Sequence, residues 1–322
     1  MKKLISLLIT LSLLCAIPAA LAGETPLRIG IAQFADHPSL DNCREGFLLG
    51  LAEAGFKDGE NIKVDFQNAQ ADMGLAAIIA SSFTDNNYDL ILAIATPMAM
   101  TAVNTADGKI PVVYSAVSAP IEAGLAYENG LYDGNATGTS DQIPIRDQLA
   151  LIRAFQPEAK KIGLLYTIGE INSQVQASQY REMAAEFGFE IVESTISTGA
   201  DIALALPSLI AQVDCLSMLT DNTVVQYLDL VLDQADSASL PVYGSEIEQV
   251  KRGCVATVGI DYVALGRQTG LIAARILGGE KADQIPFEVL KDFALYYNSE
   301  ALQQLGMALP SELSGPITDV ID

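Results

Sequence analysis

Three acidic side chains stand where a ligand cleft is expected, and they are well placed to bind a charged ligand. Asp221 follows a buried apolar run, Glu246 follows a later one, and Asp141 comes after Thr139-Ser140, where the first lobe is expected to end. Each has an ordinary structural alternative: Asp221 as a helix N-cap, Glu246 in a solvated loop and Asp141 in a hinge hydrogen bond. Together they predict recognition of a ligand ammonium group.

Hydroxyl side chains occupy the corresponding positions in the first half of the chain. Thr96 and Ser115 follow two predicted strands, and Pro97 is a good first residue for a helix that opens there. The free amides and partial positive charge of such a helix end suit a carboxylate, although helix capping is the ordinary alternative. An anion site in one half and acids in the other predict a zwitterionic ligand such as an amino acid.

Motifs for catalysis are missing from the sequence. It has no dinucleotide glycine fingerprint, no phosphate-binding loop, no zinc-binding histidine pair and no nucleophile elbow. The single histidine, His37, precedes Pro38 at the mouth of a predicted helix, where we interpret it as a helix-entry group or a ligand contact. We therefore expect a binding protein without cofactor or metal, and not an enzyme.

Elements that could position these side chains follow a regular alternation. Short apolar, β-branched runs alternate with longer helical patterns, as is typical of a parallel sheet covered by helices on both faces. The strands expected in the first half are residues 27–32, 61–66, 89–93 and 110–114, and the helices are residues 39–54, 73–83 and one opening at Pro97.

The second half repeats this plan in the same order. Arg28-Ile29-Gly30-Ile31 matches Lys161-Ile162-Gly163-Leu164, and Ile110-Pro111-Val112 matches Leu240-Pro241-Val242. Matches around Gly55 and Gly188, and around Asp89 and Asp214, lie between them. Two copies of one unit predict two similar lobes.

Ligands of open α/β sheets bind beyond the carboxyl ends of the strands. If the two lobes face each other, six such loops line one cleft. The ligand-binding residues predicted from these loops and from the end of the first lobe are Gln33, Phe34, His37, Thr96, Pro97, Ser115, Ala116, Ser140, Asp141, Glu170, Asn172, Ser173, Asp221, Asn222 and Glu246.

The C-terminal part adds one more unit, which predicts repeated crossing between the lobes. Residues 255–260 indicate a strand, 262–277 a helix and 287–297 a strand or hairpin. We assign residues 27–140 with 261–284 to the N-terminal lobe, and 141–260 with 285–322 to the C-terminal lobe.

Composition excludes several classes of partner. The formal net charge of −22 would repel nucleic acid phosphates and anionic lipid. Hydrophobic residues make up 50% of the chain, which suits two large cores. We expect a monomer that binds a small molecule and no nucleic acid.

The N-terminus indicates export. Lys2 and Lys3 precede an apolar run that ends in Ala20-Leu21-Ala22, which predicts a signal peptide over residues 1–22 and a periplasmic protein. A lipoprotein modified at Cys15 is the alternative. Three cysteines follow (Cys43, Cys215 and Cys254), so at least one thiol is free; a Cys215–Cys254 disulfide stays open.

Several motifs resemble the ABC-transporter substrate-binding family that includes tryptophan and tyrosine importers. The resemblance runs from about Leu27 to Gly279. It rests on His37-Pro38-Ser39-Leu40-Asp41, Phe66-Gln67-Asn68-Ala69-Gln70, Ala93-Ile94-Ala95-Thr96-Pro97, Thr137-Gly138-Thr139-Ser140-Asp141, Gly169-Glu170-Ile171-Asn172-Ser173, Thr220-Asp221-Asn222-Thr223-Val224 and the run from Asp261 to Gly270.

The resemblance implies a type I periplasmic binding fold, with two Rossmann-like lobes joined by a three-crossing hinge. It also implies an aromatic amino acid ligand and delivery to an ABC permease in the inner membrane. The chain departs from the family at Ile171, where a small residue is usual, and at Met98. It has no Trp, so stacking on the ligand would fall to Phe34 or a Tyr. A periplasmic sensory module is the alternative function, because its cleft would look the same.

Overall fold

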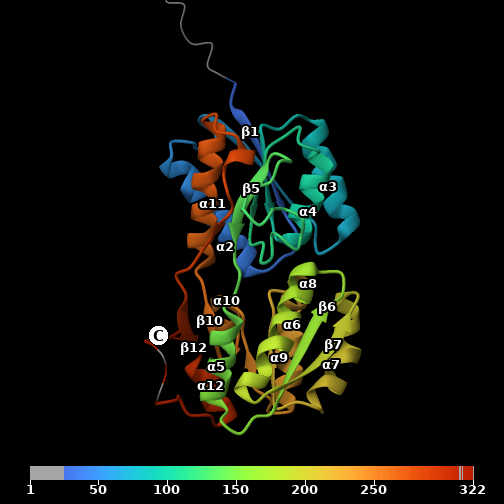
Figure 1. Cartoon of the computed structure of the whole chain (residues 1–322), viewed down its shortest axis with the longest axis vertical. Helices are drawn as coiled ribbons and strands as arrows, with labels where there is room; N and C mark the ends of the chain where they lie inside the picture. Colours follow the sequence, from blue (N-terminus) through green and yellow to red (C-terminus); the bar gives the residue numbers. More distant parts are fainter. Residues whose placement is uncertain (1–24, 312, 314, 322) are drawn as a thin grey trace, which may run out of the picture.

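Parallel sheets form the centre of both lobes, which are stacked along the long axis of the molecule (Figure 1). The computed structural model describes residues 25–311, 313 and 315–321. The predicted α/β architecture with helices on both faces of each sheet is confirmed. The predictions of a signal peptide over residues 1–22 and of lipidation at Cys15 lie outside the described residues.

The first lobe is built on a six-stranded sheet in the order β11-β5-β4-β3-β1-β2, and all its pairings are parallel. Strand β3 is buried at every position, as its continuous apolar run predicts. The elements are β1 (Leu27–Gln33), α2 (Pro38–Glu53), β2 (Ile62–Asn68), α3 (Met73–Asp85), β3 (Leu90–Ile94), α4 (Thr96–Ala106), β4 (Val112–Ser115), β5 (Ala136–Ser140), α11 (Tyr262–Leu277), the 3₁₀ helix η3 (Ala282–Gln284) and β11 (Glu288–Val289).

The second lobe has a four-stranded parallel sheet in the order β7-β6-β8-β9 and a smaller sheet in the order β10-β12-β13. Strand β12 runs antiparallel to β10. The elements are α5 (Ile145–Phe155), β6 (Lys161–Thr167), α6 (Ile171–Met183), η1 (Ala184–Phe187), β7 (Glu190–Ile196), η2 (Gly199–Asp201), α7 (Ile202–Ile210), β8 (Cys215–Ser217), α8 (Asn222–Gln226), α9 (Leu228–Ser237), β9 (Val242–Tyr243), α10 (Ile247–Lys251), β10 (Ala256–Gly259), β12 (Ala294–Tyr297), α12 (Ser299–Leu305) and β13 (Ile317–Asp319).

The internal repeat of the sequence is also seen in the order of the strands. Strand β1 lies between β2 and β3, and its counterpart β6 lies between β7 and β8. In Figure 1 the arrow of β6 points toward the first lobe. The loops that follow the strands of the two sheets therefore meet between the lobes.

The chain passes between the lobes three times, after β5, after β10 and after β11. The expected boundary at residue 285 is wrong for β11, which pairs with β5 in the first sheet. Its two residues lie within the segment 287–297 predicted as a strand or hairpin, but they carry no apolar alternation that would assign them to the first lobe. Pairing there covers the exposed edge of β5. The segment 287–297 is consequently two strands in different lobes and not a hairpin.

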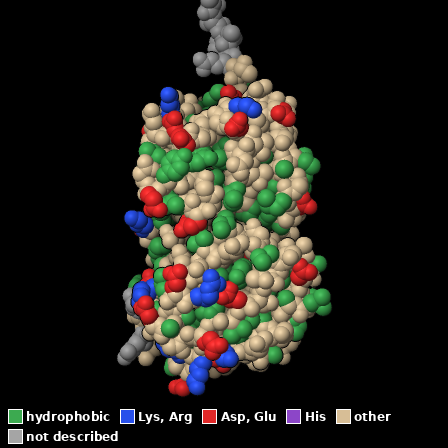
Figure 2. Space-filling model, turned by 45° about the vertical axis from the view of Figure 1, so that its right-hand side comes forward, with side chains coloured by type: hydrophobic (Ala, Val, Ile, Leu, Met, Phe, Trp, Pro, Cys, Tyr) green, Lys and Arg blue, Asp and Glu red, His purple; other side chains and the backbone are tan. Residues whose placement is uncertain are grey.

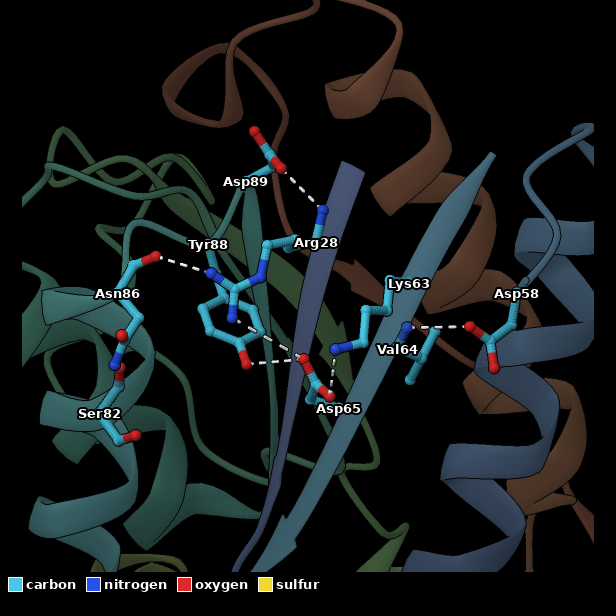
Figure 3. A network of polar contacts seen from close by, with 9 residues as sticks. All are labelled: Arg28, Asp58, Lys63, Val64, Asp65, Ser82, Asn86, Tyr88 and Asp89. Atoms are coloured by element: carbon cyan, nitrogen blue, oxygen red, sulfur yellow. Dashed lines mark hydrogen bonds and ion pairs between the residues drawn. The ribbon is translucent and has the colours of Figure 1, made fainter. Parts of the chain in front are cut away.

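A polar network fixes the first sheet at the end remote from the second lobe (Figure 3). The Arg28 guanidinium lies 3.9 Å from the centre of the Tyr88 ring, and the Tyr88 hydroxyl donates to Asp65 at 2.7 Å. This hydrogen bond lowers the pKa of Asp65. The contacts join the starts of β1, β2 and β3, which leaves the opposite ends of these strands free to carry binding loops.

The surface charges, the cysteines and the helix lengths bear on three further expectations. Acidic and basic side chains lie side by side on the face shown in Figure 2 and do not form separate patches. Cys43, Cys215 and Cys254 are buried and free, so the Cys215–Cys254 disulfide left open by the sequence is not formed. In the described part of the chain, no helix is both long and apolar enough to cross a membrane.

Candidate functional site

A small cavity lies between the lobes, where the strand-end loops meet. Its volume is about 20 Å³, the room of a single water molecule, because the lobes pack closely around it. Both lobes and the first crossing contribute to its walls. The lining residues are His37, Ser39, Leu40, Ala116, Asp141, Thr220, Asn222, Val225, Gln249 and Tyr262.

Asp141 is the carboxylate of this cavity. It follows β5, where the chain leaves the first lobe, and it is 2% exposed. One carboxylate oxygen accepts from the Ser118 hydroxyl at 2.9 Å, and the other accepts from the Tyr262 hydroxyl at 2.6 Å. Burial raises the pKa of Asp141, and these two hydrogen bonds oppose that shift. Both oxygens keep acceptor capacity for a further donor.

Two polar side chains in the cavity wall lack hydrogen-bond partners within the described residues. They are His37, at both ring nitrogens, and Ser39. Burial lowers the pKa of His37 to about 4, and nearby Asn222 opposes this without reaching hydrogen-bond geometry. Buried polar groups without partners are costly, so their presence beside Asp141 marks the place where a polar ligand would bind.

Asp221 has a different environment. Its carboxylate accepts from the Thr167 amide at 2.6 Å, the Thr167 hydroxyl at 2.9 Å, the Ser173 hydroxyl at 2.7 Å and the Val224 amide at 2.8 Å. Four donors fill the acceptor sites of a carboxylate. The geometry therefore favours the capping interpretation of Asp221 over direct contact with an ammonium group.

Glu170 joins Asp221 at the start of α8. It accepts from the amides of Asn222 at 2.9 Å and Thr223 at 3.0 Å, and from both their side chains. Burial, followed by the charge of Asp221, raises the pKa of Glu170 to about 7. Asn172 donates to the Thr220 carbonyl at 2.8 Å. The structure thus brings Glu170, Asn172, Asp221 and Asn222 together, but they mainly bind groups within the second lobe.

Glu246 also acts as a helix cap. Its carboxylate accepts from the Glu248 amide at 2.6 Å and the Gln249 amide at 2.9 Å at the start of α10. Burial raises the pKa of Glu246 to about 7. The Ser39 hydroxyl of the first lobe lies close enough to lower that pKa but outside hydrogen-bond geometry.

Four helices that start near the cavity differ in their capping. In the second lobe, Asp221 caps α8 and Glu246 caps α10 with their own carboxylates. In the first lobe, α2 and α4 begin without a side-chain cap and carry a proline in the first turn. Free amides and partial positive charge therefore remain at the first-lobe helix ends.

Several predicted residues serve the first lobe internally. The Gln33 amide donates to Ala35 and Asp41, and Ser115 bonds with Thr269 at 3.0 Å. Phe34 is 3% exposed within the first-lobe core and does not line the cavity, so it is not placed to stack on a ligand there. The structure buries Thr96, Pro97 and Ser140 near the strand ends without placing them in the cavity wall.

Six cavity residues are absent from the predicted set: Ser39, Leu40, Thr220, Val225, Gln249 and Tyr262. Tyr262 follows the crossing after β10, so the strand-end rule could have found it, but that rule was applied to six other loops. Gln249 lies inside α10, and its side chain donates to Ser245 at 3.0 Å. No sequence signal marks it. Four predicted residues do line the cavity: His37, Ala116, Asp141 and Asn222. No group of metal-ligating side chains is found among the described residues.

The buried acids predict that mild acid stabilises the protein. The pKa of Glu246 is raised from 4.5 to about 7 in the folded protein, so protonation of Glu246 stabilises the fold. This stabilisation is complete below pH 4.5 and is lost as pH rises through about 7. His37 acts oppositely, because its pKa is lowered from 6.5 and stability falls as pH falls toward 4. Between pH 8 and pH 6, Glu246 contributes about 1 kcal/mol, and Glu170 adds to it.

Urea unfolding at pH 8 and pH 6 measures this difference. The free energy of unfolding should be larger at pH 6, and Glu246→Gln should reduce the gain by about 1 kcal/mol. An equal gain in both proteins would show that Glu246 is ionised throughout.

The chain is similar to one protein family, to a named relative and to a solved structure. The family described as ABC transporter substrate binding protein matches residues 28–321. A tyrosine-binding protein of Clostridioides difficile is 40% identical over 279 residues, which cover 87% of this chain and 81% of the relative. An ABC domain of Streptococcus pneumoniae, solved in complex with L-Trp, is 31% identical, with a TM-score of 0.88 over 91% of this chain and 100% of that one.

A further solved relative indicates the conformation of the lobes. The ligand-free, open structure of a substrate-binding protein with adhesive properties from Clostridium difficile is 40% identical and covers 91% of this chain and 99% of that one. Its TM-score is 0.68, below the 0.88 of the less similar L-Trp complex. The narrow cavity and this ranking agree that the present lobes are closed.

Proposed function

Because the chain belongs to the ABC transporter substrate-binding protein family, we propose that this solute-binding component captures an aromatic L-amino acid between its lobes. The ligand would then pass to an ABC permease in the inner membrane. Members of this family work outside the cytoplasm. The signal peptide, the monomeric state and the absence of catalysis stay predictions of the sequence.

The observation that carries the proposal is Asp141. It is a buried carboxylate on the cavity wall whose pKa is raised, and its partners in the structure are two neutral hydroxyls. A buried carboxylate gains most from a cationic donor. The α-ammonium group of an amino acid supplies such a donor in a compact form.

The other parts of an amino acid also have matching surroundings. Its carboxylate would face the uncapped start of α2, whose first residues line the cavity and where free amides and partial positive charge remain. His37 and Ser39 offer further unpartnered polar atoms there. Leu40, Val225 and Tyr262 provide apolar surface for an aromatic side chain, which needs a wider separation of the lobes because the present cavity of about 20 Å³ holds only one water molecule. The relatives that bind L-Trp and are named for tyrosine support this choice.

Isothermal calorimetry with L-tyrosine, L-tryptophan and L-phenylalanine tests the proposal. At least one should bind with a Kd of about 1 μM or tighter, equivalent to about −8 kcal/mol. Burial of an aromatic side chain contributes roughly 1.5–3 kcal/mol, and charged hydrogen bonds add to it. Absence of heat with all three, or saturation by a sugar or a nucleoside, would show the ligand class to be wrong.

A further inference from the structure

A chain of hydroxyl and amide groups runs across the lobe boundary and ends on Asp141. Gln176 of α6 donates to the Thr220 hydroxyl at 2.6 Å, and the Ser118 and Thr220 hydroxyl oxygens lie 2.8 Å apart. The Ser118 hydroxyl then reaches Asp141 at 2.9 Å. Ser118 belongs to the loop after β4 in the first lobe, while Thr220 belongs to the loop after β8 in the second.

The donors in this chain have a fixed direction. Asp141 as a carboxylate accepts only, so Ser118 must use its single proton there. Ser118 can then only accept from Thr220, and Thr220 in turn accepts from the Gln176 amide. Hydrogen bonds aligned in one direction polarise one another. The chain therefore makes Ser118 a stronger donor to Asp141 when the lobes are closed.

Thr220 is held firmly on the second-lobe side. Its backbone amide donates to the side-chain oxygen of Gln176 (Oε1) at 3.0 Å, and its backbone carbonyl accepts from Asn172 at 2.8 Å. Ser118 and Gln176 also line a second cavity between the lobes, of about 110 Å³. The hydroxyl pair thus lies between two cavities, apart from the contact in which Asn42 of α2 donates to Glu248 of α10 at 3.1 Å.

From this geometry we infer that Ser118 and Thr220 are positioning residues, which hold the Asp141 carboxylate for the ligand ammonium only when the lobes close. The inference rests on the proposed function. Separation of the lobes breaks the Ser118–Thr220 contact and leaves Asp141 with a weaker donor. Closure and ammonium binding stabilise the same charged carboxylate, so each favours the other.

Matched substitutions test the positioning role. Thr220→Val removes the hydroxyl and keeps the shape, whereas Thr220→Ser keeps the hydroxyl. Thr220→Val and Ser118→Ala should each weaken aromatic amino acid binding by about 10-fold, mainly through faster dissociation, and Thr220→Ser should restore it. Because both residues serve one contact, the double variant should bind little worse than the weaker single variant. Unchanged affinity, or fully additive losses, would overturn the inference.

A second readout separates this inference from the ligand assignment. Ile78 of α3 and Leu204 of α7 are 65% and 84% exposed, so cysteines placed there can carry a pair of distance probes across the two lobes. Without ligand, Thr220→Val should populate the short distance less than wild type or Thr220→Ser does. Equal distance distributions in Thr220→Val and wild type would show that the Ser118–Thr220 contact does not favour closure. If the wild type binds none of the three amino acids, the proposed function fails while this measurement still judges Ser118 and Thr220.

Discussion

Replacing Asp141 by asparagine should weaken binding of an aromatic amino acid by about 30- to several-thousand-fold, because a charge-assisted hydrogen bond is lost inside a closed cleft. The amide presents one oxygen and an NH₂ group, and the latter repels an ammonium ion. Calorimetry or competition with a labelled amino acid measures the loss. Asp85→Asn makes the same change of charge at an exposed site of the first lobe and should leave the affinity unchanged.

The same substitution should leave the ligand-free protein as stable as the wild type, or slightly more stable. Burial already raises the pKa of Asp141, so a neutral side chain avoids that cost. Its two donors are the hydroxyls of Ser118 and Tyr262, which can turn to accept from an amide. Unchanged affinity in Asp141→Asn would remove the residue from the ligand site, whereas a large fall in Tm would give it a structural role.

The fold could be predicted because its signals are local and repeated. Continuous apolar strands such as β3 alternate with helices, and the match of residues 28–31 to 161–164 predicted two similar lobes, in which β1 and β6 do take equivalent positions. The sheet that strand β11 joins could not be predicted in this way. Two residues have no periodicity, and their place in the first sheet depends on the free edge of β5, which exists only once the sheet has formed.

The sequence could locate the candidate site but could not assign a role to each of its residues. The strand-end rule brought His37, Asp141 and Asn222 to one cavity. It could not distinguish Asp141 from Asp221, because both are acids that follow strands. The difference lies in their partners. The donors to Asp221 come from Thr167, Ser173 and Val224, which only the folded chain brings together.

Asp221 is the residue for which the structure changes the expected result. If its carboxylate bound the ammonium group, Asp221→Asn would abolish binding and keep the Tm, since Asn caps helices as well as Asp. The structure instead surrounds it with four donors, two of them the backbone amides of Thr167 and Val224. These amides bond to opposite carboxylate oxygens, so either orientation of an asparagine turns its NH₂ group toward one of them.

Backbone amides cannot reverse as hydroxyls can, so Asp221→Asn should destabilise the ligand-free protein by about 2–4 kcal/mol. Part of this loss is offset, because the substitution also removes the repulsion between Asp221 and Glu170. The Tm should therefore fall by several degrees in Asp221→Asn and stay level in Asp141→Asn, whereas affinity measured well below the Tm should fall furthest in Asp141→Asn. Thermal unfolding and calorimetry on both variants give this crossed pattern. A stable Asp221→Asn protein that no longer binds would reverse the roles of the two acids.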